Sequence, residues 1–147
     1  MADALFVTDK LTPAQRQTLE GMLVSLSFAN GRVLLEEGAV APGLFLVEAG
    51  TVEVTKKDMG GHAQKITELK APAVIGELEL LTGDPCTASI VARGTVQAKL
   101  LPRASFDSLL DKGDAGAIQL MRNLARALGQ KLTATDEVYV DMAIWRR

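Results

Sequence analysis

The chain has 147 residues, of which 48% are hydrophobic and 23% charged, which is enough for one domain with its own hydrophobic core. Sixteen basic and eighteen acidic residues give a formal net charge of -2, so no excess of positive charge favours direct DNA binding or an anionic membrane surface. The single cysteine, Cys86, excludes an internal disulfide and agrees with a reducing compartment.

The N-terminus has neither the basic region nor the long apolar run of a secretory signal. No apolar stretch approaches the length of a membrane span. We therefore expect a cytoplasmic protein without a membrane anchor, folded as a single domain over residues 1–147.

A helix is predicted near the N-terminus. Thr12, Pro13 and Gln15 have the positions of a capping hydroxyl, a first-turn proline and a capping-box side chain. The helix is expected over residues 13–24, within an N-terminal helical segment of residues 10–27. An apolar stripe on this helix predicts packing against the flank of the domain. It consists of Leu19, Met22, Leu23 and Leu26.

From residue 28 to residue 101 the pattern is typical of a β-sandwich or barrel. Short β-type runs alternate with turn signals such as Asn30-Gly31, and Gly50 is expected to turn a hairpin. In the two clearest runs Val52 and Val96 alternate with polar neighbours, so each of these two strands has one buried and one exposed face. Strands are predicted over residues 33–35, 44–47, 51–55, 65–69, 87–91 and 96–101.

Residues 74–92 hold the candidate binding site. Gly76, Glu77 and Leu78 are placed where a short helix begins, with free backbone N–H groups directed at an anion. Pro85 and the residues just before it end this helix, and a strand follows.

This segment resembles the phosphate-binding cassette of the cyclic-nucleotide-binding domain family, the module of the cyclic-AMP receptor protein and of protein kinase A regulatory subunits. The run GRVLLEEGAVAPGLFLVEAGTVEV is similar to the family's opening strands, and the resemblance covers about residues 10–143. It implies a mainly β fold with flanking helices: a β-barrel or jelly roll of the cyclic-nucleotide-binding type with an N-terminal helix and a long C-terminal helix. The residues that match the cassette pattern are Gly76, Glu77, Leu80, Pro85 and Ala88.

The resemblance implies that the Glu77 carboxylate accepts a ribose 2′-hydroxyl while backbone amides hold the phosphate of a cyclic nucleotide. The chain departs from the family at Cys86, where the family has a phosphate-binding arginine, and at Glu79, where it has a small residue. A bidentate arginine–phosphate contact contributes roughly 1.5–3 kcal/mol. No cation is expected beside Glu77, Glu79 or Asp84. The candidate ligand-binding residues are Gly76, Glu77, Leu78, Cys86, Thr87, Ala88 and Thr135.

These residues also have plain structural interpretations. The Gly76-Glu77-Leu78 run equally fits a helix start whose glutamate stabilises its own helix dipole. Thr87 could donate its hydroxyl to a phosphate or be an ordinary strand residue. Arg93 is expected to face solvent rather than to replace the missing arginine. Cys86 is expected to be a small, half-buried and unreactive side chain.

Two helices are predicted in the C-terminal segment, residues 102–143: a short one over residues 104–110 and a long one from about residue 115. Apolar and small residues recur three and four apart along the long helix, as in a coiled-coil seam. We expect its first part to pack on the barrel and its second part to form a homodimer; packing of the whole stripe on its own domain is the alternative. The resemblance implies that Thr135 closes over the base, although a threonine there could equally let two helices approach. The seam contains Ile118, Met121, Ala125, Leu128, Leu132, Thr135, Tyr139 and Met142.

No residue set predicts catalysis, a metal site or a resident cofactor. The one histidine, His62, is expected in an exposed hairpin turn and cannot alone supply a metal cluster or a Ser/His/Asp set. Glu77 and Glu79 are two apart, so they point in different directions on a helix and do not share a reaction centre. We expect a non-enzyme.

Two hypotheses of function follow. The first is a stand-alone regulatory domain that senses a cyclic nucleotide through a pocket without the usual arginine. The second is a ligand-independent, dimeric protein–protein interaction module that keeps the fold and binds through the helix of residues 115–142. Since the chain ends soon after this helix, we expect the output to be a partner protein or the oligomeric state.

Overall fold

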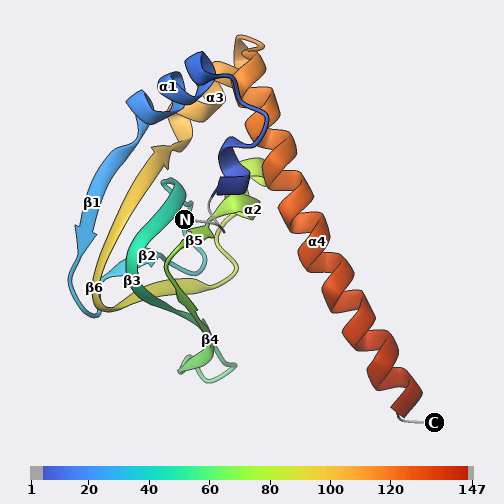
Figure 1. Cartoon of the computed structure of the whole chain (residues 1–147). Coiled ribbons are helices and arrows are strands. Elements are labelled where there is room, and N and C mark those ends of the chain that lie inside the picture. Colours follow the sequence, from blue (N-terminus) through green and yellow to red (C-terminus); the bar gives the residue numbers. More distant parts are fainter. Residues whose placement is uncertain (1–4, 146–147) are drawn as a thin grey trace.

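The computed structural model, which describes the backbone of residues 5–145 and the side chains of residues 6–132, is an antiparallel sheet with helices on both sides of it in the sequence (Figure 1). The chain starts with the 3-10 helix η1 (Leu5–Thr8) and α1 (Pro13–Met22). The strands are β1 (Val24–Phe28), β2 (Val33–Leu35), β3 (Gly43–Lys57), β4 (Ala63–Lys70), β5 (Ala73–Ile75) and β6 (Ser89–Pro102). Between β5 and β6 lies α2 (Glu77–Thr82), and α3 (Arg103–Asp111) and α4 (Ala115–Trp145) follow β6.

The strands form one sheet in the order β1-β6-β3-β4, with β2 paired to β6 and β5 paired to β3. The long strands β3 and β6 replace four shorter predicted ones. Gly50, expected to turn a hairpin, instead lies where the register shifts on either side of Ala49, and this irregularity bends β3 without ending it. The expected fold, mainly β with an N-terminal helix and a long C-terminal helix, is confirmed.

The start of α1 is as predicted. The Thr12 N–H donates to Gln15 Oε1 at 2.9 Å, and the Gln15 N–H donates to Thr12 Oγ1 at 3.2 Å, which completes the capping box. The helix ends at Met22, earlier than predicted, because Val24–Phe28 pairs with β6 as strand β1. Leu26, expected on the helical stripe, therefore lies in a strand.

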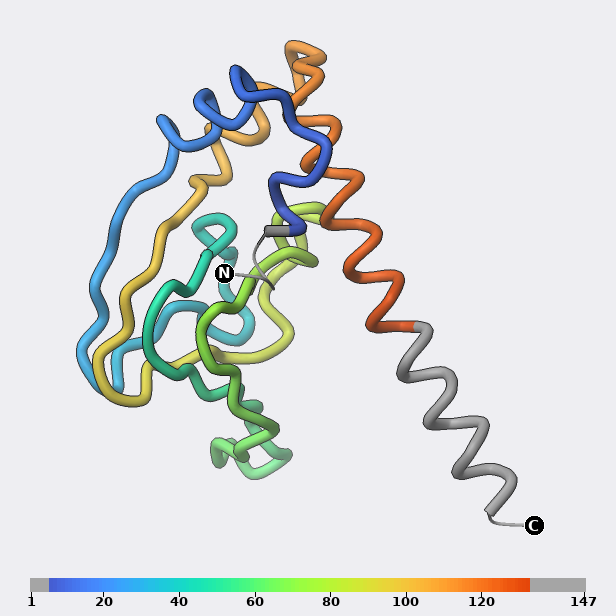
Figure 2. Tube along the Cα trace, in the orientation of Figure 1, coloured from blue at the N-terminus to red at the C-terminus, as the bar shows by residue number. Residues whose placement is uncertain are grey.

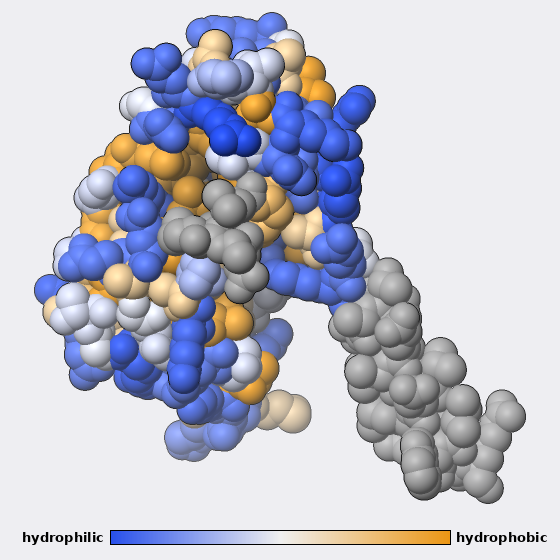
Figure 3. All heavy atoms as spheres, viewed as in Figure 1, coloured by the Kyte–Doolittle hydropathy of each residue, from blue (hydrophilic) through white to orange (hydrophobic). Residues whose placement is uncertain are grey.

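The hydrophobic core has two clusters. One lies against the sheet and includes Phe45, Val52 and Val96. The other joins the end of the sheet to the helices and includes Phe106 and Leu124. In Figure 3, hydrophilic residues cover much of the described part of α4, and hydrophobic residues gather over the sheet. Within the described part of the chain, no helix is long and apolar enough to cross a membrane.

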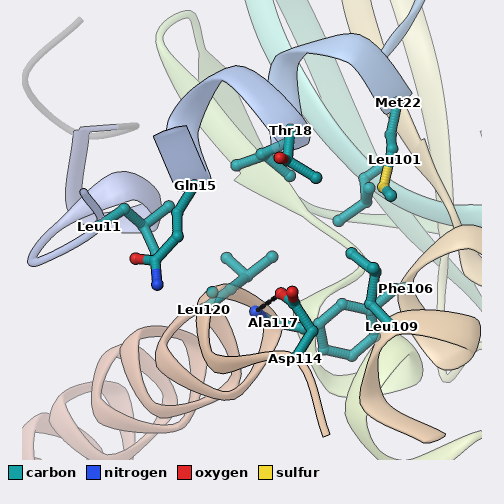
Figure 4. Close-up of a pocket in the computed structure, with 12 residues that line it drawn as sticks. Leu11, Gln15, Thr18, Met22, Leu101, Phe106, Leu109, Asp114, Ala117 and Leu120 are labelled. Atoms are coloured by element: carbon teal, nitrogen blue, oxygen red, sulfur yellow. Dashed lines mark hydrogen bonds between the residues drawn. The ribbon is translucent and has the colours of Figure 1, made fainter. Parts of the chain in front are cut away.

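A narrow apolar crevice lies where α1, α3 and α4 meet (Figure 4). Its volume is about 20 Å³, room for about one water molecule. At its edge the Asp114 carboxylate accepts a hydrogen bond from the Ala117 N–H at 2.9 Å and satisfies a free amide in the first turn of α4. Because Leu19, Phe106 and Leu120 on its walls belong to the core, we interpret the crevice as a packing gap.

A buried asparagine connects the beginning of the chain to α4, beside which η1 runs (Figure 2). Asn123 is only 3% exposed. Its Nδ2 donates to the carbonyl oxygens of Val7 at 3.1 Å and Asp9 at 2.8 Å, and its Oδ1 accepts from Gln119 Nε2 at 2.9 Å. A single side chain thus satisfies two carbonyls of the η1 segment.

We predict that Asn123→Ala lowers the free energy of unfolding by about 2 kcal/mol, because two partly or fully buried carbonyls lose their donor. Urea denaturation measures this change. Arg126→Ala, at an exposed position on the same helix, is the control and should change stability by no more than about 0.5 kcal/mol. Equal effects of the two substitutions would contradict this account of Asn123.

Candidate ligand-binding site

A cavity of about 230 Å³ lies against α2 and the sheet. Its wall is mostly aliphatic, and its polar side chains come from Glu77, Glu79 and Thr87. Such a lining suits a small molecule that has both an apolar face and a few polar groups. The aliphatic residues are Leu35, Val54, Leu69, Val74, Ile75 and Ile90.

Gly76 allows α2 to begin close to β3. Its φ of 87° is in the left-handed region that favours glycine. A Cβ at this position would lie 2.9 Å from the carbonyl oxygen of Gly43. Gly76 therefore places Glu77 and Leu78 at the cavity wall, where Leu78 is 43% exposed.

The Glu77 carboxylate is paired with a cation from another element. Glu77 is 8% exposed, and its Oε1 accepts a hydrogen bond from the Lys131 Nζ of α4. The expectation that no cation lies beside Glu77 is therefore wrong. A sequence signal for Lys131 is its spacing, because it precedes Thr135 by four residues and positions four apart share a helix face. That spacing does not connect the face to Glu77. Thr135 itself lies outside the residues whose side chains the structure describes.

Cys86 is placed in the core and not on the cavity. Its side chain is 3% exposed, more buried than expected, and belongs to the cluster against the sheet. The Cys86 N–H donates to the Ala39 carbonyl and the Cys86 carbonyl accepts from the Gly38 N–H, both at 2.8 Å. Burial raises the pKa of the thiol, and the negative charge of Glu79 raises that pKa further. At neutral pH the sulfur is therefore protonated and uncharged.

The remaining predicted residues come together at the cavity. Thr87 is exposed and Ala88 half-buried, and both line it. They precede β6, which begins at Ser89, so Thr87 is not the strand residue of the alternative interpretation. The cavity thus unites Gly76, Glu77, Leu78, Thr87 and Ala88 of the predicted set, and Cys86 is the described residue of that set which lies elsewhere.

Two arginines lie close to the cavity residues in sequence or in space, but both are engaged by other groups. Arg93 is exposed, as predicted, and pairs with Glu53, which lowers the pKa of the Glu53 carboxyl. Arg103 donates from Nη2 to the Glu79 carbonyl at 3.3 Å, and its Nε lies 3.7 Å from Asp107 Oδ2. A cation stabilises a helix when it lies near the carbonyl groups at the helix's C-terminus. Arg103, which no local sequence signal connects to this segment, thus stabilises α2 from the helix's C-terminal part.

His62 is exposed in the turn between β3 and β4, as predicted, where its N–H donates to Asp58 Oδ1 at 2.9 Å. Among the described residues, no group of three or more His, Cys, Asp or Glu side chains is arranged to hold a metal ion. The polar chemistry of the cavity is therefore that of carboxylates, a hydroxyl and backbone groups.

A family model described as "Cyclic nucleotide-binding domain" matches residues 25–112. The chain is 33% identical over 100 residues to the cAMP-dependent protein kinase regulatory subunit of Blastocladiella emersonii, covering 68% of this chain and 25% of that protein. It is 35% identical over 97 residues to the cAMP-dependent protein kinase type II regulatory subunit of Drosophila melanogaster, covering 65% and 26%. The chain spans about a quarter of the length of these curated relatives.

Solved structures share the fold. A cyclic nucleotide-binding domain from Methylobacillus flagellatus has a TM-score of 0.79 at 22% identity, covering 93% of this chain and 80% of that one. The Catabolite Activator Protein of Thermus thermophilus has a TM-score of 0.74 at 22% identity, covering 94% and 62%. A regulatory subunit of a cAMP-independent protein kinase A from Trypanosoma brucei, in a substituted form bound to cAMP, has a TM-score of 0.65 at 22% identity, covering 86% and 49%.

Proposed function

Because this chain belongs to the cyclic nucleotide-binding domain family and is homologous to regulatory subunits of cAMP-dependent protein kinase, we propose that it is a regulatory domain. In this proposal the domain senses a cyclic nucleotide, or a ligand built on the same ribose, through an altered pocket. The observation that carries the proposal is the Glu77 carboxylate, buried at the wall of a cavity of about 230 Å³. A carboxylate in this position can accept hydrogen bonds from the hydroxyls of a sugar.

The ion pair between Glu77 and Lys131 is the contact through which ligand binding would affect α4. Lys131 belongs to α4, so a ligand hydroxyl on Glu77 meets a carboxylate that already binds this helix. A ligand shifts a conformational equilibrium only through contacts that differ between the two states. We expect the Glu77–Lys131 pair to be such a contact, because a ligand hydroxyl on Glu77 would compete with Lys131 of α4 for the carboxylate.

The pocket is altered where the family binds phosphate. Cys86 contributes a buried, uncharged sulfur where the family has an arginine, and Glu79 adds a carboxylate. In the cAMP-bound Trypanosoma brucei variant, glutamate is replaced by alanine, threonine by arginine seven positions later, and the adjoining valine by alanine. Glu79, Cys86 and Thr87 have the same spacing here. That cAMP-bound variant supports the proposal that these three positions decide whether cAMP is accepted.

The alternative function, a dimeric interaction module without a ligand, is favoured by one observation. Met121 is 36% exposed and Leu132 65% exposed on the described part of α4, although both fall on the predicted coiled-coil seam. Exposed apolar residues at that spacing fit a second copy of the helix. In either case we expect a regulatory protein that acts through a partner or its own association, without catalysis.

The test is thermal denaturation with a millimolar panel of cyclic AMP, cyclic GMP, cyclic dinucleotides and the corresponding nucleosides. A ligand at a hundred times its Kd stabilises a protein by about 2.7 kcal/mol, several degrees in Tm for a domain of this size. We expect at least one panel member to raise Tm, and Glu77→Ala to abolish the shift. Glu20→Gln, at an exposed position on α1, is the control and should keep it.

The absence of a shift across the whole panel would contradict the sensor proposal. The interaction module would then be tested by sedimentation equilibrium of the wild type and of Leu132→Asp. A wild-type dimer that dissociates in the variant would support the alternative, and a wild-type monomer would exclude it.

A further inference from the structure

The charges around the cavity are unbalanced. Among the described residues that line it, Glu77 and Glu79 are acidic and none is basic. Carboxylates carry negative charge at neutral pH. Lys131 reaches this site from α4 and offsets one of the two charges through its ion pair with Glu77. The cavity therefore keeps an excess of negative charge.

The groups near the cavity that could offset this negative charge are engaged elsewhere or are uncharged. Arg93 is paired with Glu53, and Arg103 lies at the carbonyl end of α2 near Asp107. The Cys86 thiol is buried and uncharged. The partial positive charge at the N-terminus of α2 faces two carboxylates in its own first turn. An anionic group in this cavity would thus meet a negative field.

Building on the proposed function, we propose that the ligand of this cavity is an uncharged, ribose-bearing molecule, a nucleoside in chemical class, and that a cyclic phosphate is disfavoured. The apolar wall can pack against the face of a base. Glu77 can accept a hydrogen bond from a ribose hydroxyl, and the Thr87 hydroxyl can donate or accept one without needing a charged partner. A phosphodiester would bring a second negative charge close to Glu79 without a cassette arginine to neutralise it.

Matched ligand pairs test this inference. Isothermal titration would compare adenosine with cyclic AMP and guanosine with cyclic GMP. The members of each pair share the base and the 2′-hydroxyl, and the cyclic phosphate takes the place of the nucleoside's free 3′- and 5′-hydroxyls. We expect the better-binding nucleoside to bind at least about tenfold more tightly than its cyclic nucleotide. The reason is that one like-charge repulsion at the edge of a protein cavity weakens binding by about this factor. Raising the salt concentration should narrow the difference by screening that repulsion.

A charge-only variant tests the cause. Glu79→Gln keeps the size of the side chain and leaves Glu77 in place, so it should strengthen cyclic nucleotide binding about tenfold relative to nucleoside binding. The control Glu20→Gln should change neither. An unchanged ratio in Glu79→Gln would overturn the electrostatic explanation.

The possible results distinguish a failure of this inference from a failure of the proposed sensor function. A cyclic nucleotide that binds as tightly as its nucleoside, or more tightly, would overturn this inference and leave the sensor function standing. Binding of neither ligand class would overturn the proposed function itself.

Discussion

Restoring the family's cassette in this chain should give a high-affinity site for cyclic AMP. The combined substitution Glu79→Ala, Cys86→Arg and Thr87→Ala changes the stretch PCTA to PRAA and removes the carboxylate beside it. An arginine adds a bidentate phosphate contact, about tenfold to hundredfold in affinity. Loss of the Glu79 charge adds roughly another tenfold. We therefore expect the Kd for cyclic AMP to fall at least a hundredfold, as measured by isothermal titration.

The weak point of that variant is position 86, which is buried in the core in the wild type. The new arginine side chain must leave the core and turn towards the cavity, so the Tm of the variant has to be measured alongside its affinity. Glu79→Ala with Thr87→Ala, without the arginine, is the matched control and should gain only about tenfold. A folded triple variant with the affinity of the wild type would contradict our account of the pocket.

Gly43→Ala should be the most destabilising small substitution near the site. Gly43 begins β3, and a Cβ there would lie 2.0 Å from the carbonyl oxygen of Leu101 on β6. That neighbour is backbone within a paired strand, so it cannot rotate away as a side chain could. We expect the free energy of unfolding to fall by more than about 3 kcal/mol, measured by urea denaturation.

The same substitution should also affect the cavity, because the Gly43 carbonyl lies so close to Gly76, at the start of α2, that a Cβ on Gly76 would be 2.9 Å from its oxygen. Gly21→Ala is the matched control: it lies in α1, and apart from its chain neighbours and the backbone of its own helix no atom lies within 4 Å of the added Cβ. In a helix, alanine is favoured over glycine by up to about 1 kcal/mol, so this control should be neutral or stabilising. A stable Gly43→Ala protein would mean that β3 and β6 are less closely packed than the structure indicates.

Local signals in the sequence predicted well where neighbouring residues determine the structure. The capping box of Thr12 and Gln15 depends on residues three apart, and both of its hydrogen bonds are present. Alternation likewise identified the buried faces of β3 and β6, where Val52 and Val96 are inaccessible. Gly76 and Gly83, on either side of α2, both adopt the left-handed backbone that favours glycine.

Predictions failed where distant contacts decide the structure. Residues 24–28 continue the apolar pattern of α1 but become a strand because β6 offers a free edge. Periodicity alone does not distinguish a short apolar strand from the end of a helix. The Glu77–Lys131 pair joins residues 54 positions apart, and the burial of Cys86 depends on packing against the sheet. Five of the residues that line the cavity were thus named from the sequence, but its aliphatic wall and the charges around it required the fold.

The most direct test of the sensor proposal is a titration of the ¹⁵N-labelled chain with adenosine, and separately with cyclic AMP, followed through the backbone amide resonances. We predict saturable shifts that centre on Gly76, Glu77, Leu78, Thr87 and Ala88 and extend to the region of Lys131, with adenosine saturating at the lower concentration. Resonances that stay unchanged with both ligands, or shifts confined to the crevice between α1, α3 and α4, would contradict the assignment of the cavity as the ligand site.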